Sequence, residues 1–277
     1  MATALPTVSI VIPAYNEQET IRACVLAALD QTVAATEIVV VDNRSTDGTA
    51  AVVRALQAAY PESPIVYVKQ DAQQGIIPTR NFGLDIASGE VIGRIDADSV
   101  LEPNWVEEVQ KAFVDMSVAA CTGPVIYYDM PLRRFGAIAD DALRRALILI
   151  ASEHHLLFGS NMAIRATAWR QVRDQACLDP DDELHEDIDL SLYLNMLDLK
   201  IAYSSEMVTG MSARRLDDSP REFYNYVMRF ERTYQKHNVR SIALRAPMAI
   251  FLSSYPALKA MRQNELRNER RKARAAK

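Results

Sequence analysis

Residues 8–17 read VSIVIPAYNE, and this stretch decides the fold. Its first six residues form an apolar, β-branched run, which is typical of a strand covered on both faces by helices. Similar runs follow at residues 37–41, 65–68 and 91–95. Helix-like segments of about ten to fifteen residues separate these runs, and this alternation predicts a parallel sheet with right-handed crossovers, an α/β fold.

The polar end of the opening stretch predicts the start of a helix. Asn16 precedes Glu19 by three residues, the spacing of a capping box, in which each side chain bonds the other residue's backbone N–H. Further helices are predicted at residues 46–60 and 77–87, the second stopped by Gly89.

The second half of the chain is less regular. It predicts helices at residues 103–113, 132–152, 187–197 and 220–237, and strands at residues 118–125, 160–164 and 200–204. No repeat or low-complexity linker divides the chain, so a clean two-domain split is not indicated.

The composition is that of an ordinary globular protein, with 277 residues, 49% hydrophobic and 24% charged. A net charge of -5 gives no reason to expect nucleic acid as a partner. The three cysteines, Cys24, Cys121 and Cys177, lack metal-ligand spacing, so buried free thiols are expected.

The C-terminal region combines an apolar segment, residues 242–261, with a tail of seven basic and two acidic residues. One interpretation is an interfacial anchor on anionic lipid. The other is a docked helical hairpin with a solvated tail. The N-terminus lacks the pattern of a secretion signal, and residues 246–258 are too short to span a bilayer, so we expect a cytoplasmic protein, with peripheral contact to the membrane as the alternative.

Three polar clusters each follow the end of a predicted strand, at residues 14–17, 42–45 and 96–98. Because ligands of parallel sheets bind at the carboxyl ends of the strands, we expect these clusters to meet at one edge. Asp96 and Asp98 suit a hard divalent cation. The alternative for them is a solvated turn in which Asp98 caps the next helix.

Other polar residues also have two interpretations. Asp42 either accepts a hydrogen bond from a nucleotide base or caps a turn, and Arg80 either reaches the nucleotide or lies on a solvated helix face. Asp187, in the acidic stretch at residues 185–189, is a candidate general base or a helix-start carboxylate. Arg214 and its neighbour Arg215 either close over a diphosphate or form a solvated pair.

Together the motifs SIVIPAYNE, VVVDNRSTDGT, GIIPTRNFG, IDADS, FGSNMAIR and HEDIDLSLYL resemble, in order and spacing, the family 2 glycosyltransferases. The resemblance covers about residues 7–200. It implies the GT-A fold, in which a Rossmann-like nucleotide-binding half carries a mixed central sheet. We therefore expect a GT-A domain over residues 1–215, with a nucleotide-binding half to about residue 98 and an acceptor half beyond it. Residues 216–277 would form a C-terminal helical extension with a basic tail.

The resemblance also implies roles for individual residues. Those implied to bind the nucleotide sugar are Pro13, Ala14, Tyr15, Glu17, Asp42, Arg80, Asp96 and Ala97. Those implied to lie beside the donor sugar and acceptor are Gly159, Ser160 and Asn161. Asp98, with Asp96, would bind a divalent cation, Mg or Mn. Asp187 would be the catalytic base, paired with Glu186.

The implied activity is inverting transfer of one sugar from a nucleotide-diphosphate donor, UDP-linked by preference, to a hydroxyl of a glycan or lipid-linked acceptor. The Gln-x-x-Arg-Trp motif of processive, membrane-embedded relatives is absent, which favours a single transfer. Two alternatives stay open, an inactive sugar-nucleotide-binding or assembly subunit and a nucleotidyltransferase. The latter normally has a Gly-rich phosphate loop after the first strand, where this chain has AYNEQET.

Overall fold

A computed structural model describes residues 4–151, 153–176, 178–179 and 181–275. Its central feature is a seven-stranded sheet in the order β3-β2-β1-β4-β8-β6-β9. The strands are β1 (Val8–Ala14), β2 (Glu37–Asp42), β3 (Ile65–Lys69), β4 (Val91–Arg94), β6 (Val118–Thr122), β8 (Met162–Arg165) and β9 (Lys200–Tyr203). A smaller sheet joins β5 (Val100–Leu101), β10 (Thr209–Met211) and β7 (Val125–Tyr127).

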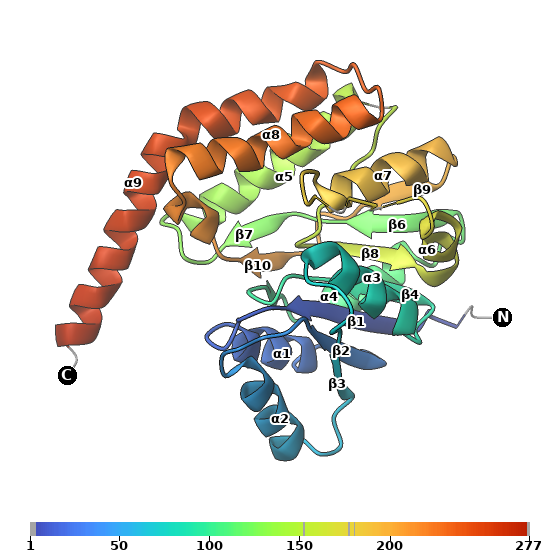
Figure 1. Cartoon of the computed structure of the whole chain (residues 1–277), viewed down its shortest axis with the longest axis vertical. Coiled ribbons are helices and arrows are strands. Elements are labelled where there is room, and N and C mark those ends of the chain that lie inside the picture. Colours follow the sequence, from blue (N-terminus) through green and yellow to red (C-terminus); the bar gives the residue numbers. More distant parts are fainter. Residues whose placement is uncertain (1–3, 152, 177, 180, 276–277) are drawn as a thin grey trace.

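Helices cover both faces of the central sheet (Figure 1). They are α1 (Ile21–Leu29), α2 (Thr49–Ala59), α3 (Ile76–Ile86), α4 (Trp105–Ala112), α5 (Arg133–Ile150), α6 (Ala166–Val172), α7 (Glu186–Met196), α8 (Pro220–Lys236) and α9 (Ala246–Ala275), with 3-10 turns η1 (Arg214–Asp217) and η2 (Ala243–Arg245).

The alternation of side chains along β1 explains this layering. Ile10 and Ile12 point into the core formed with α1, α2 and α4, whereas Val11 points into the core formed with α3, α6 and α7. Every residue of β1 is buried, as the unbroken apolar run predicts. Gly83 lets α3 approach closely, because a Cβ there would lie 2.3 Å from the Cγ1 of Val11.

The sheet is mixed rather than wholly parallel. Strands β1 to β4 are parallel, as the alternating pattern predicts, but β8 runs antiparallel to both of its neighbours, β4 and β6. Local sequence patterns carry no information on strand direction in the second half. The resemblance, which implies a mixed sheet, is correct on this point.

Two local predictions are wrong. Asn16 does not cap a helix with Glu19: it has a positive φ of 54°, its Oδ1 accepts from the N–H of Thr46, and α1 begins only at Ile21. The predicted strand 118–125 is two strands, β6 and β7, in different sheets.

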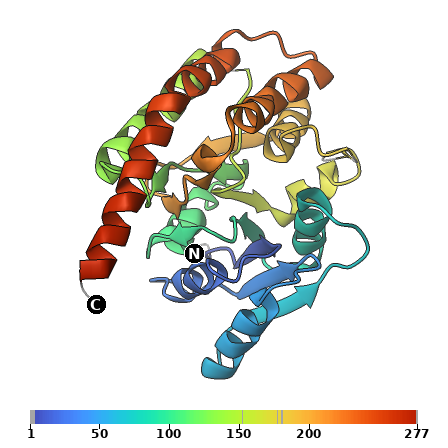
Figure 2. The same cartoon turned by 60° about the vertical axis from the view of Figure 1, so that its left-hand side comes forward.

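The C-terminal region packs against the rest of the protein. Helix α8 starts with a capping box between Ser219 and Glu222, and α9 runs beside it as one long helix (Figure 2). Met248 and Tyr255 of α9 are buried in a third apolar core with α7 and α8. Arg262 of α9 is also buried and forms ion pairs with Asp129 and Asp217. The apolar first half of α9 is thus docked, and the predicted domain division at residue 215 stays a prediction.

Two further sequence expectations concern cysteines and membrane spans. Cys24 and Cys121 are buried and free, as predicted, and Cys177 lies outside the described residues. Within the described ranges, no helix has both the length and the apolar character needed to cross a bilayer.

Candidate active site

The three predicted polar clusters meet at the carboxyl edge of the parallel strands. Ala14 at the end of β1 is in register with Asp42 at the end of β2, and Val11 is in register with Arg94 at the end of β4. Beyond the strands, the N–H of Asn16 donates to the Oγ of Ser45. The loops that follow β1 and β2 are therefore joined, and Arg214 links Glu17 of the first loop to Asp98 after β4.

Asp98 is a buried carboxylate at this edge, whereas the side chain of Asp96 is 32% exposed. Burial and the charge of Asp96 raise the pKa of Asp98 to about 6. The Nε of Arg214 lies 3.0 Å from Asp98, and its charge opposes that shift. Asp96 opens a turn, because its carbonyl accepts from the N–H of Ser99, but Asp98 is buried and does not cap α4, whose N-cap residue is Asn104.

Arg94 is the main site residue that sequence reasoning missed. It is buried at the end of β4, and its Nη2 lies 2.9 Å from Asp96 and 3.3 Å from Glu186. A single guanidinium thus links the acid that follows β4 to the acid that opens α7. The only sequence signal is an Arg within an otherwise apolar strand, which is unusual for a fully covered position.

Glu186 and Asp187 are held at the start of α7, which is packed between the sheet on one side and α8 on the other. The charges of Arg94 and Arg80 lower the pKa of Glu186 although burial opposes them. Burial and the negative charge of Glu186 raise the pKa of Asp187. The pKa values of these two neighbouring acids are therefore shifted in opposite directions, which favours Asp187 as the group that takes up a proton.

Gly159 supports Asp187 directly. Its backbone N–H donates to Oδ2 of Asp187 at 2.7 Å, while the N–H of Ile188 donates to Oδ1. A Cβ at position 159 would lie 2.0 Å from Nη1 of Arg94, so only glycine fits between the loop and the guanidinium. Ser160 lies in the following turn, before β8.

Arg214 crosses from η1 to the β1 loop. Its two Nη atoms bond both carboxylate oxygens of Glu17, at 3.0 and 2.7 Å, and its Nε reaches Asp98. The neighbouring Arg215 instead lies over the ring of Tyr226 and pairs with Asp218. The two adjacent arginines thus have different surroundings. Only Arg214 contacts the acidic edge, the name used here for the carboxylates of Glu17, Asp96 and Asp98 at the ends of β1 and β4.

The other residues predicted to bind the nucleotide lie along the same edge. Pro13 and Ala14 end β1, Tyr15 is 52% exposed beside them, and Ala97 is buried between the two acids. Asp42 is buried, its Oδ1 accepting from the N–H of Ser45 and its Oδ2 from the hydroxyl of Tyr67. The turn-capping interpretation of Asp42 is thus correct, and contact with a base stays a prediction.

Two predicted site residues are buried in the interior instead. Arg80 is fully buried and donates to the Glu186 carbonyl and to Asn81, so it lies beneath the start of α7 rather than on a solvated face. Asn161 is also fully buried; it donates to two backbone carbonyls and accepts from the indole N–H of Trp105. Both side chains hold backbone carbonyls of neighbouring segments in place. This geometry does not support their contact with a ligand.

The residues after β4 fit a divalent cation. Asp96 and Asp98 offer carboxylate oxygens, the ligands that Mg and Mn prefer, and their mutual repulsion raises the pKa of Asp98. A cation beside them would relieve that repulsion. His185, Glu186 and Asp187 also have ligand atoms within 4.8 Å of one another. Arg94 lies beside both groups, 2.9 Å from Asp96 and 3.3 Å from Glu186, so its charge does not distinguish them.

The fold and the acidic edge place the protein in the class of α/β proteins that bind ligands at the carboxyl ends of parallel strands. Residues 9–173 match the model of glycosyl transferase family 2, and the chain belongs to this family. The predicted resemblance is therefore confirmed.

The chain is also similar to individual proteins. Glycosyltransferase AglE of Haloferax volcanii is 38% identical over 39% of this chain and 35% of its own, and chondroitin synthase of Pasteurella multocida is 38% identical over 42% of this chain and 12% of its own. The chain thus matches only about a third or less of these two relatives. The uncharacterized glycosyltransferase YibD of Escherichia coli is 23% identical over 87% of this chain and 70% of its own.

Solved structures show the same fold. The mannosyltransferase PcManGT of Pyrobaculum calidifontis, determined in complex with GDP-Man and Mn2+, has a TM-score of 0.64 with 19% identity over 96% of this chain and 75% of its own. TarS of S. aureus has a TM-score of 0.55 with 18% identity over 80% of this chain and 38% of its own. The predicted GT-A fold with a C-terminal helical region is confirmed.

Proposed function

We propose that this protein is an inverting, metal-dependent glycosyltransferase that moves one sugar from a nucleotide-diphosphate donor to an acceptor hydroxyl. The observation that carries the proposal is the pairing of Arg94 with both Asp96 and Glu186. It brings the acids that would hold the donor beside Asp187, the acid that would accept a proton. This arrangement matches the two tasks of a single displacement.

The donor half of the site is the edge formed by the ends of β1, β2 and β4. Tyr15 and Asp42 would contact the nucleotide, and Asp98 with Asp96 would hold Mg or Mn. When bound, this cation neutralises the charge of the departing nucleotide. A UDP-sugar is our preferred donor. Because the mannosyltransferase PcManGT was solved with GDP-Man and Mn2+, GDP-mannose is the second donor to test.

Asp187 would act as the general base. Both of its oxygens already accept one backbone hydrogen bond, which fixes the carboxylate in place while leaving lone pairs for an acceptor hydroxyl. Asp187 takes the hydroxyl proton, the hydroxyl oxygen bonds to the anomeric carbon, and the bond from that carbon to the diphosphate oxygen breaks. Attack opposite the leaving group inverts the anomeric configuration, with no covalent sugar-enzyme intermediate.

The acceptor would be a hydroxyl of a glycan or of a lipid-linked sugar. Membrane contact through the C-terminal segment, the alternative that the sequence leaves open, is less well supported because the apolar first half of α9 is docked on α7 and α8. Intact acids at positions 96, 98, 186 and 187 favour an active enzyme over an inactive subunit.

The test uses the full-length chain and a panel of UDP-, GDP- and dTDP-sugars with Mn or Mg. We expect release of the nucleotide diphosphate from one donor, dependent on the metal. Asp98→Asn should abolish the metal dependence, and Asp187→Asn should abolish transfer while donor binding persists. Donor turnover that survives both substitutions unchanged would contradict the assignment.

A further inference from the structure

Helix α5 has its polar side turned inward and its apolar side turned outward. Towards the protein, Arg144 pairs with Asp140, whose carboxylate also accepts from the backbone of Val125. Asp141 accepts from the hydroxyl of Tyr203 on β9. A surface helix normally buries its apolar stripe against the core and exposes its charges. In α5 this relation is reversed in the middle of the helix, where Ile138 is exposed while Asp140 and Arg144 face the protein.

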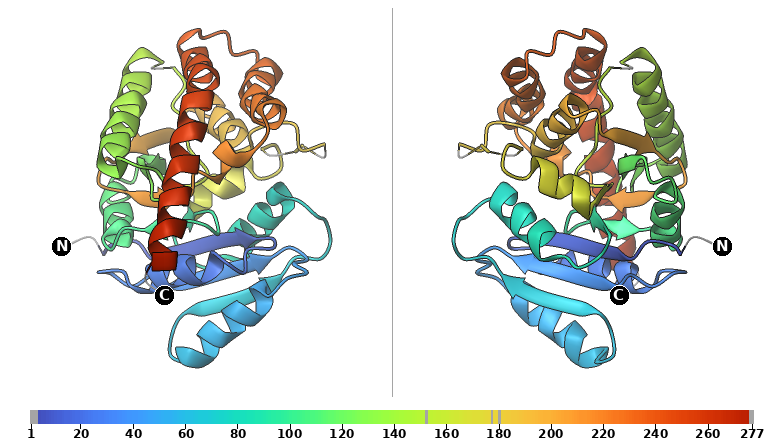
Figure 3. Two further views of the ribbon diagram at one scale, coloured as in Figure 1. Left: turned by 90° about the vertical axis from the view of Figure 1, so that its left-hand side faces the viewer. Right: turned by 90° about the vertical axis from the view of Figure 1, so that its right-hand side faces the viewer.

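The outward side of α5 carries large apolar side chains at helical spacing. Phe135 is 75% exposed, Ile138 is 67% exposed and Leu149 is 80% exposed. Leu132 and Ile150 at the two ends are similarly exposed. Both views in Figure 3 show α5 at the outer edge of the molecule, on the side away from α6 and α7. We call this set of five side chains the α5 face.

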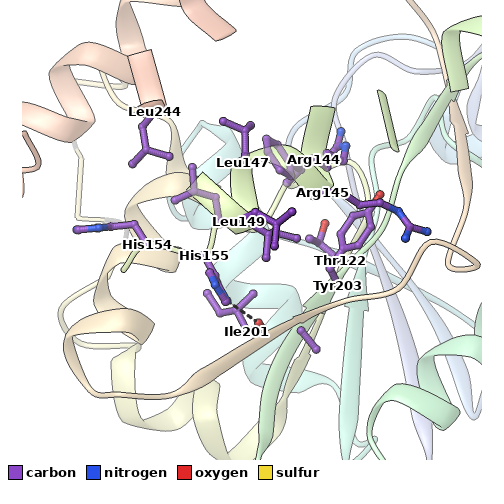
Figure 4. Close-up of a pocket in the computed structure, with 14 residues that line it drawn as sticks. Thr122, Arg144, Arg145, Leu147, Leu149, His154, His155, Ile201, Tyr203 and Leu244 are labelled. Carbon is purple, nitrogen blue, oxygen red and sulfur yellow. Dashed lines mark hydrogen bonds between the residues drawn. The ribbon is translucent and has the colours of Figure 1, made fainter. Parts of the chain in front are cut away.

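An apolar cavity opens beside the α5 face. It has a volume of about 430 Å³ and lies between the last turns of α5, strand β9 and η2 (Figure 4). Leu147, Leu156 and Leu244 line it, and Leu149 belongs both to the cavity wall and to the exposed face. The last turns of α5 are therefore incompletely packed on the side that faces the cavity. The cavity leaves room there for part of an apolar chain, next to the exposed Leu149.

Basic side chains flank the α5 face. Arg133 and Arg134 are exposed at the start of α5. Arg240 is exposed in the loop before η2, and η2 itself contacts α5. No acidic side chain in the described part of the chain pairs with any of the three. Cations beside an apolar stripe match the surface of an anionic bilayer. A second copy of the chain would instead bring a face with the same arginines.

We propose that the α5 face is a membrane-docking surface, on which Phe135, Ile138 and Leu149 insert among the acyl chains of an anionic bilayer while Arg133 and Arg134 contact lipid phosphates. The surface is distinct from the C-terminal tail and from the acidic edge. It would hold the enzyme beside lipid-linked acceptors, but binding to lipid requires neither donor nor acceptor.

The test is cosedimentation of the full-length chain with vesicles of phosphatidylcholine, with and without phosphatidylglycerol. We expect binding to the anionic vesicles that weakens as salt is added. The double variant Phe135→Gln, Leu149→Gln should bind about tenfold more weakly or worse, because two apolar groups leave the bilayer. Each of Arg133→Gln and Arg134→Gln should weaken anionic binding by about fivefold.

Two controls separate the α5 face from other causes. Met116→Gln removes an apolar side chain of matched exposure, 77%, in the turn before β6, and should leave binding unchanged. Replacing Arg270, Arg271 and Lys272 by Gln tests the tail and should also have no effect. Circular dichroism checks that each variant is folded.

Other results would overturn the proposal. These are no binding to anionic vesicles, binding that persists in the Phe135 and Leu149 variant, or binding lost only with the tail cations. If the wild type formed a concentration-dependent dimer and bound no vesicles, and the Phe135 and Leu149 variant were a monomer, the α5 face would be assigned to a second copy of the chain. Nucleotide-sugar turnover, measured without vesicles, reports separately on the proposed function.

Discussion

Nη2 of Arg94 lies 3.3 Å from Oε1 of Glu186, so the end of strand β4 is paired with the first residue of helix α7. The same nitrogen lies 2.9 Å from Asp96. Glu186 keeps its charge beside this cation, and that charge in turn raises the pKa of the adjacent Asp187. Arg94 therefore connects the two halves of the site and makes neighbouring carboxylates chemically unequal.

Replacing Arg94 by Gln should lower the free energy of unfolding by about 3–5 kcal/mol, because it removes a buried cation and leaves the largely buried Glu186 without this partner. Urea denaturation measures this change. The control is Arg173→Gln, which breaks an ion pair with Asp85 at a half-exposed surface site and should cost about 1 kcal/mol or less. Equal losses in the two variants would show that Arg94 is not an integral part of the site.

Gly159→Ala should abolish or strongly reduce donor turnover. The new methyl group would lie 2.0 Å from Nη1 of Arg94, so the loop must move and Asp187 loses the N–H that orients it. The matched control is Gly136→Ala in α5, where the added methyl group meets nothing within 4 Å beyond its own helical turn. This second variant should be stabilised by about 0.5–1 kcal/mol, because alanine favours a helix over glycine.

Asp187→Asn should lower the rate of transfer by about a hundredfold to ten-thousandfold with little change in donor affinity, as expected for a lost general base. In the wild type the base works only when ionised. Because its pKa is raised, the rate should fall on acidification at a higher pH than an ordinary aspartate, near 4, would give. A pH-rate profile without this acidic limb would contradict the role of Asp187.

Arg214→Gln should strengthen binding of Mn at pH 8 by about two- to fivefold, because the half-exposed guanidinium then no longer competes for Asp98 and Glu17. Isothermal titration calorimetry measures this affinity. Arg215→Gln, at the adjacent and similarly exposed position, should leave it unchanged, because Arg215 contacts Tyr226 and Asp218 instead. Weaker Mn binding in Arg214→Gln would mean that Arg214 supports the metal site.

The sequence predicts the parts of this structure that depend on neighbouring residues. The strands β1 and β2 and the acids at 96 and 98 are evident from short runs, because a covered strand needs unbroken apolar residues and its end meets solvent. Arg214 contacts Glu17 from the far end of the domain, and no local pattern encodes such a pair. The burial of Asn161 and Arg80 cannot be predicted from local sequence for the same reason, since their hydrogen-bond partners lie on other elements.

The turn η1 joins two contacts that lie at opposite ends of it. Arg262 of α9 bonds Asp217 at its end, and Arg214 at its start bonds Glu17 and Asp98. Because η1 has only four residues, a movement of its end should also move its start. C-terminal truncations should therefore affect the acidic edge differently according to whether they keep the α9 residues that bond η1. Chains cut after residue 262 should retain the acidic edge. Chains cut before Tyr255 lose all three α9 side chains that bond the end of η1 and the next residue, and should free Arg214 from Glu17 and Asp98.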